Sequence, residues 1–222
     1  MVVPRKERLS DSFERISNQG SPRDLTLLVC PVAYKDYFQG MVNHLELGSK
    51  VVVESINSEK AFNLQLKDIV ETSLQAKTHR RLFALLDIYN SRNKEIDSAS
   101  QILEAQKLVK IHNHSNNKIF RLLISNPSFF FWLLLHFKLV DYSALPESKW
   151  LHRMEEELEE FIPNFKSAKT QKEYFNLSYS HIDTAIKNSQ RLQFLRTIRQ
   201  TPSSDIHELV VYLLKLHRRY VS

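Results

Sequence analysis

Glycine is scarce in this chain of 222 residues, which contains only Gly20, Gly40 and Gly48. Tight β-turns and phosphate-binding loops use glycine because it reaches positive φ angles without steric cost. An all-β barrel or a doubly wound nucleotide-binding sheet would be expected to contain more of it. The low glycine content therefore favours a helical protein.

Cysteine is almost absent as well. The single cysteine, Cys30, cannot form an internal disulfide, and it lies in the apolar stretch 25–30. Buried cysteine commonly behaves as a small hydrophobic side chain. A chain without internal disulfides fits a reducing compartment. We therefore expect an intracellular protein, located in the nucleus or the cytoplasm, with Cys30 in its core.

Long hydrophobic runs are also missing. The most apolar stretch, Phe129–Leu135, is far shorter than the roughly 20 residues of a membrane-spanning helix. Residues 1–12 carry charges but no apolar segment, unlike a signal peptide. We expect no association with a membrane.

Motifs of catalysis and cofactor binding are absent too. The chain has no glycine-rich phosphate loop, Rossmann fingerprint, HExxH or Gly-x-Ser-x-Gly. We therefore predict no enzyme, cofactor or small-molecule substrate, although an active site assembled from residues distant in sequence stays a third alternative. His112 and His114 supply only two metal ligands, so we predict a solvated loop and no metal site. The acidic run 155–160 lies opposite an apolar stripe, which indicates a solvated helix face.

Helical periodicity dominates what is present. Apolar residues from Leu66 to Leu74 follow the i, i+3, i+4, i+7 spacing of an amphipathic helix, and the stretch 82–89 repeats it. Further helices are predicted near 98–109, 118–125, 127–140, 147–162, 168–200 and 205–220. The fold class we predict is mainly α, a multi-helix bundle or an irregular helical array.

One region near the N-terminus has β character. Residues 50–56 are rich in β-branched side chains, and apolar and polar residues alternate from Phe62 to Leu66. These two stretches predict a small β-hairpin, although a helix beginning at Ser58 fits equally well. The predicted organisation is a flexible polar arm at 1–24, a mixed α/β element at 25–67 and a helical domain at 68–222. A short amphipathic helix from Asp11 is an alternative for the arm.

The most unusual local feature is a run of four aromatic residues, Phe129, Phe130, Phe131 and Trp132. Four successive side chains on one helix point in different directions, so they cannot all face the same core. Either this helix is central, or a partner covers one side. As a partner-binding site, the run predicts a non-enzymatic adaptor or structural subunit that binds another protein subunit in a larger intracellular complex.

Positive charge suggests the alternative function, that of a basic helical protein that binds nucleic acid. The formal net charge is +6. Lysine and arginine contacts to phosphates supply non-specific nucleic-acid affinity, but no recognition-helix, zinc-finger or RNP pattern accompanies them. An earlier basic cluster consists of Lys77, His79, Arg80 and Arg81. The candidate nucleic-acid-binding residues lie late in the chain and are Arg191, Arg196, Arg199, Lys215, Arg218 and Arg219.

Overall fold

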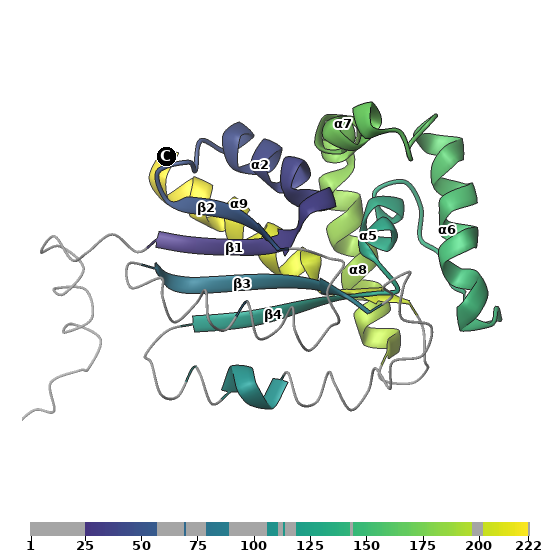
Figure 1. Cartoon of the computed structure of the whole chain (residues 1–222), viewed down its shortest axis with the longest axis horizontal. Coiled ribbons are helices and arrows are strands. Elements are labelled where there is room, and N and C mark those ends of the chain that lie inside the picture. Colours follow the sequence, from purple (N-terminus) through teal and green to yellow (C-terminus); the bar gives the residue numbers. More distant parts are fainter. Residues whose placement is uncertain are drawn as a thin grey trace, which may run out of the picture.

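A computed structural model of the chain shows an α/β fold, with helices packed around a mostly parallel sheet (Figure 1). The structure describes residues 25–56, 69, 79–88, 106–110, 113, 119–142, 144–196 and 202–221. Within this part of the chain, five strands lie in the order β2-β1-β3-β4-β5. β1 to β4 are parallel, and β5 is antiparallel to β4. The prediction of a mainly α, all-helical bundle is therefore wrong.

The elements are as follows. The strands are β1 (Leu25–Pro31), β2 (Val51–Ile56), β3 (His79–Asp87), β4 (Ile119–Asn126) and β5 (Ser203–Ser204). The helices are α2 (Lys35–His44), α5 (Phe129–Leu135), α6 (Glu147–Phe161), α7 (Ala168–Ser178), α8 (Ile182–Arg196) and α9 (Ile206–Val221). The short 3-10 helices are η1 (Val32–Tyr34) and η2 (Tyr179–His181).

The helix predicted at 82–89 is a strand because β3 is buried on both faces. Phe83 and Leu85 belong to the core cluster on one side of the sheet, whereas Leu82, Ala84 and Leu86 belong to the cluster on the other. Central strands of parallel sheets read as continuous apolar runs rather than as an alternating pattern. Such a run also satisfies the helical spacing, so periodicity alone could not separate the two structures.

Two other predictions concern strands. The stretch 118–125 was expected to be a helix, but it forms most of β4. The prediction of a strand at 51–56 is confirmed as β2, but β2 pairs in parallel with β1, so its observed pairing is not that of a hairpin. The second half of the predicted hairpin, 62–66, lies outside the described residues. So do the arm at 1–24 and most of the segments 66–74, 98–105 and 112–117.

The inference from low glycine content was wrong, and two described turns reach positive φ angles with residues other than glycine. Glu46, in the turn after α2, has a φ of 55°, and Asn164 has a φ of 57°. Non-glycine residues adopt this left-handed region at a modest energetic cost. Gly40 instead permits close helix packing, because a Cβ atom there would lie 3.0 Å from ring atoms of Phe175 in α7.

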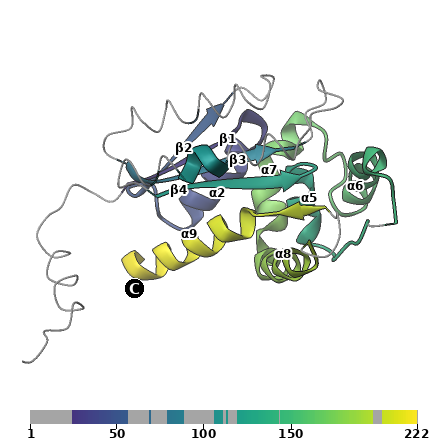
Figure 2. The ribbon, with the colours of Figure 1, turned by 90° about the horizontal axis from the view of Figure 1, so that it is seen from below.

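The helices fall into two groups. Helices α2 and α9 cover one face of the sheet, and α5 to α8 lie beyond the carboxyl ends of its strands (Figures 1 and 2). The helices predicted near 147–162 and 205–220 are confirmed as α6 and α9. The boundary between the proposed elements 25–67 and 68–222 falls between β2 and β3 of one sheet. No described helix has the length and apolar character needed to cross a membrane.

Candidate nucleic-acid interface

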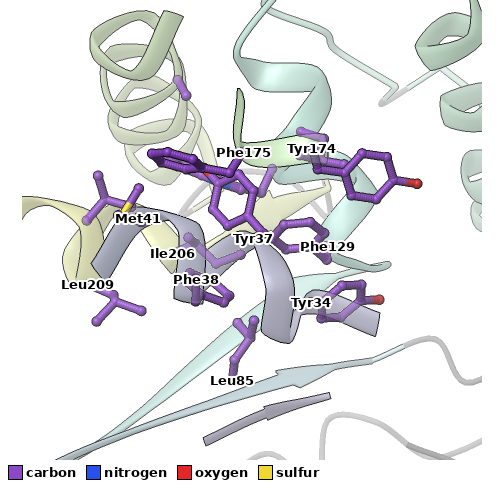
Figure 3. Close-up of a cluster of buried hydrophobic side chains, with 14 of the residues drawn as sticks. Tyr34, Tyr37, Phe38, Met41, Leu85, Phe129, Tyr174, Phe175, Ile206 and Leu209 are labelled. Carbon is purple, nitrogen blue, oxygen red and sulfur yellow. The ribbon is translucent and has the colours of Figure 1, made fainter. Parts of the chain in front are cut away.

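The aromatic run lies largely in the core. Phe129, Phe131 and Trp132 are fully buried, and Figure 3 shows Phe129 enclosed by other buried side chains. Phe130 is half-buried, and its ring packs edge-on against that of Phe165, with 5.3 Å between the centroids. In this fold, a partner cannot contact three of the four rings that the sequence suggested for partner binding.

A buried hydrogen-bond network also fixes this helix. The indole Nε1 of Trp132 donates to the hydroxyl oxygen of Tyr37 at 3.0 Å. The Nδ1 of His136 donates to the carbonyl oxygen of Trp132 at 3.0 Å, which leaves Nε2 to accept from the Tyr37 hydroxyl at 3.3 Å. Burial lowers the pKa of His136 to about 4. His136 is therefore a neutral structural residue at physiological pH.

The carboxyl ends of β1 and β3 are where a doubly wound sheet commonly binds ligands, because the strand order reverses between these strands. Asp87 ends β3, and its Oδ2 accepts a hydrogen bond from the Tyr34 hydroxyl. The Tyr34 ring stacks on Phe129 with 4.2 Å between centroids. Asp87 Oδ1 is buried and has no hydrogen-bond partner among the described residues.

Asp87 is an unusual acid among the residues that the structure describes at this end of the sheet. Burial raises the pKa of Asp87 to about 7, while hydrogen bonds from Tyr34 and the Phe129 backbone act in the opposite direction. Burial also raises the pKa of Cys30 to about 12, so its thiol stays protonated and is a poor nucleophile. Cys30 is fully buried, as the sequence predicted. The described residues contain no cluster of three or more His, Cys, Asp or Glu side chains that could hold a metal ion.

The opposite, amino end of the sheet has a different character. Helix α9 buries Leu209, Leu213 and Leu216 against the core. Lys215, Arg218 and Arg219 are exposed on its other side, so the predicted amphipathic pattern of this helix is confirmed.

Two further basic residues join α9 through contacts that only the fold creates. The Nζ of Lys50, directly before β2, lies 4.4 Å from the ring centroid of Tyr220. The guanidinium of Arg81 in β3 lies 5.7 Å from the ring centroid of Tyr212, whose hydroxyl is 2.7 Å from Thr26 Oγ1. We call this group the amino-end basic surface, which consists of Lys50, Arg81, Lys215, Arg218, Arg219 and the ring of Tyr220.

The sequence pattern could find only part of this surface. Lys215, Arg218 and Arg219 were candidates, and Arg81 belonged to the separate early cluster. Lys50 and Tyr220 were missed because no sequence signal connects residues 170 positions apart. Parallel pairing of β1 with β2 places Lys50 at this edge of the sheet, where α9 ends.

The remaining basic candidates are not brought to the same place. Ser189 of α8 contacts His207 in the first turn of α9 at 2.9 Å, so the exposed Arg191 lies near the start of α9. Arg218 lies about 16 Å further along that helix, at 1.5 Å per residue. The side chain of Arg196 and the whole of Arg199 lie outside the described residues.

Several acidic side chains of the described residues form ion pairs away from the end of α9. Glu208, at the start of α9, pairs with Arg121 at 3.1 Å. The acidic run on α6 is only partly the solvated face that the sequence predicted. Glu157 is buried and pairs with Lys138 and Arg153, each at 2.8 Å. Glu46 is exposed in the turn before Lys50, and it is the one acidic residue among positions 45–49.

The architecture defines a class, the open α/β proteins with a mostly parallel sheet and helices packed around it. Within this class, the family model described as RloB-like protein matches residues 32–213, which is most of the chain. The chain therefore belongs to the RloB-like family. Neither a curated protein nor a solved structure matches it significantly.

Proposed function

We propose that this protein is a non-enzymatic, intracellular nucleic-acid-binding protein, and that the amino-end basic surface contacts the phosphates. The observation that carries the proposal is the convergence of Lys50, Arg81 and the exposed cations of α9 on one end of the sheet. These residues come from three segments that are far apart in the sequence. A solvated helix face alone does not account for that convergence.

The chemistry of the surface fits a polyanion. Arginine guanidinium groups bind phosphate oxygens through two parallel hydrogen bonds, and lysine contributes a mobile positive charge. Each phosphate that is neutralised releases condensed counterions, which strengthens binding at low salt. The second half of α9 carries Lys215, Arg218 and Arg219 and no acidic side chain.

A protein partner ranks second as a candidate ligand. The adaptor hypothesis depended on exposure of the aromatic run, and three of its four rings are enclosed by the chain itself. Binding another subunit through a different surface is compatible with the fold, but no described surface favours a particular protein partner.

The test is a binding titration with fluorescently labelled oligonucleotides, both single-stranded and duplex, at increasing salt. The variant combines Lys215→Glu with Arg219→Glu. The matched control combines Lys169→Glu with Lys172→Glu, since both lysines are exposed on α7, away from the end of α9 (Figures 1 and 2).

We expect wild-type affinity to fall steeply with salt. The α9 variant should bind at least about tenfold more weakly. Its salt dependence should also be shallower, because the slope falls by about one for each phosphate that the variant no longer neutralises. The α7 control, with the same change in net charge, should bind nearly as well as wild type. Equal losses of affinity in the two variants, or no binding of either oligonucleotide at low salt, would reject the proposal.

A further inference from the structure

We infer that the amino-end basic surface prefers single-stranded over duplex nucleic acid, because Tyr220 offers its ring for stacking by an unpaired base. This inference rests on the proposed function and names the form of nucleic acid that the surface selects. It depends on a feature that positive charge alone does not explain, namely an exposed aromatic ring in contact with Lys50.

Tyr220 differs from the other tyrosines that the structure describes. Its exposed fraction is 53%, whereas Tyr34, Tyr37, Tyr142 and Tyr174 are buried and Tyr179 and Tyr212 are partly buried. Tyrosine carries a large apolar ring, so exposing it in the last turns of a helix forgoes the burial that the other rings obtain. A ring that remains accessible in this position is available to a ligand.

The ring is also held in place by a cation. The Nζ of Lys50 lies 4.4 Å from the ring centroid, which is a cation–π contact. The ammonium group covers part of the ring, and the remaining exposed surface leaves access for a base. Lys50 is then positioned to meet the phosphate next to that base.

The cations of α9 begin beside this ring and run back along a neighbouring side of the helix, since Arg219 lies about 100° around the helix axis from Tyr220. Arg219 is seven residues after Tyr212, so the two lie on the same side of the helix, and Lys215 lies between them. Tyr212 is itself in contact with Arg81. The distance along the axis from Tyr212 to Tyr220 is about 12 Å.

This combination of a basic track and an accessible ring is the arrangement by which proteins bind single strands without sequence preference. Every base has a π-face, so stacking tolerates any sequence. In a duplex the bases are stacked on each other and paired, and a ring on a helix surface cannot reach their faces unless a base is extruded at an energetic cost. The phosphates are accessible in both the single strand and the duplex, so we expect the Tyr220 ring to distinguish between the two forms.

The experiment compares a 12-nucleotide oligothymidylate with an abasic oligonucleotide of the same length, which has the same phosphates and no bases. We expect wild type to bind the oligothymidylate about tenfold more tightly, within the range that one base–aromatic stack supplies. Tyr220→Ala should reduce affinity for the oligothymidylate to that for the abasic strand. Tyr220→Phe should keep the difference, because it retains the ring, and a 12-base-pair duplex should bind wild type more weakly than the oligothymidylate.

Two results would overturn the inference. One is equal affinity of wild type for the two single strands, and the other is an equal loss of affinity for both in Tyr220→Ala. If Lys215→Glu with Arg219→Glu still weakens binding of every oligonucleotide in that case, charge-based binding stands and only the stacking fails. If that variant has no effect on any oligonucleotide, the proposed function itself fails. Thermal melting of each variant confirms that the fold is retained.

Discussion

The two ends of the sheet are built in opposite ways. At the carboxyl end, Asp87, Tyr34 and Phe129 contact one another, and buried aromatic side chains surround them. At the amino end, Lys50 and the last turns of α9 present positive charge to solvent. The carboxyl end is the usual ligand-binding side of such folds, yet among the described residues its side chains are largely buried, and Asp87 Oδ1 is buried there without a hydrogen-bond partner. The conspicuous aromatic run therefore stabilises the fold, whereas the accessible binding chemistry lies at the other end.

The largest expected effect on stability comes from placing a charge among the buried side chains at the carboxyl end of the sheet. Phe131→Asp should destabilise the protein by more than about 3 kcal/mol or prevent folding, because it removes a fully buried ring and buries an unpaired carboxylate. Lys215→Glu with Arg219→Glu, at the exposed end, should change the free energy of unfolding by no more than about 1 kcal/mol. Urea denaturation of both variants measures the contrast. A stable, folded Phe131→Asp protein would contradict this difference between the two ends of the sheet.

Much of the helical part of this fold could be predicted from sequence. The amphipathic pattern of α9 and the stripe that includes Trp150, Met154 and Leu158 in α6 specify helices with one buried side, and both are observed. The central sheet could not be predicted in the same way. β3 is apolar on both faces, and a short run of that kind fits a strand or a buried helix equally well.

The candidate site was only half predictable for a related reason. Exposure of Lys215 follows from the pattern of its own helix, because the apolar side of that helix identifies the opposite side. The contact between Lys50 and Tyr220 depends on strand order and on the direction of α9 across the sheet. Local sequence carries no information about either, so the surface becomes visible only in the fold.

A smaller effect is expected in the pH dependence of stability, to which Asp87 contributes. Burial raises its pKa from 3.8 to about 7 in the folded protein, so the folded state holds this proton more tightly than the unfolded state does. Its contribution to stability is full below about pH 4 and is lost as the pH rises through 7. Asp87→Asn removes this dependence. The stability of the variant relative to wild type should therefore rise between pH 4 and 7, by a few kcal/mol at most, and then level off.

His136 changes stability in the other direction over part of this range. Its folded pKa is lowered to about 4, so its contribution is present above pH 6.5 and is lost as the pH falls towards 4. Because His136 is present in both proteins, its effect cancels in the comparison of Asp87→Asn with wild type. Chemical denaturation at several pH values gives the difference in unfolding free energy between Asp87→Asn and wild type. A difference that does not vary with pH would show that the pKa of Asp87 is not raised in the folded protein.

The smallest effect tests how tightly the helices pack at the carboxyl end. A methyl group in Gly40→Ala would lie 3.0 Å from two ring atoms of Phe175, so α2 and α7 must separate slightly. The gain in helix propensity is about 1 kcal/mol, and overpacking costs about 1–3 kcal/mol. We expect a net destabilisation of about 1 kcal/mol by thermal melting. A rise in melting temperature would mean that α2 and α7 can separate at little energetic cost, and that the carboxyl end is less rigid than its aromatic core suggests.

The central claim is that nucleic acid binds at the amino end of the sheet, and photo-crosslinking tests it most directly. A single-stranded oligonucleotide containing 4-thiothymidine is bound to the intact protein at low salt and irradiated, and the attached peptides are identified by mass spectrometry. We expect crosslinks to the segment 206–221, with Tyr220 prominent, and to residues around Lys50. Crosslinks concentrated instead on α6, α7 or the residues around Tyr34 and Asp87 would contradict it.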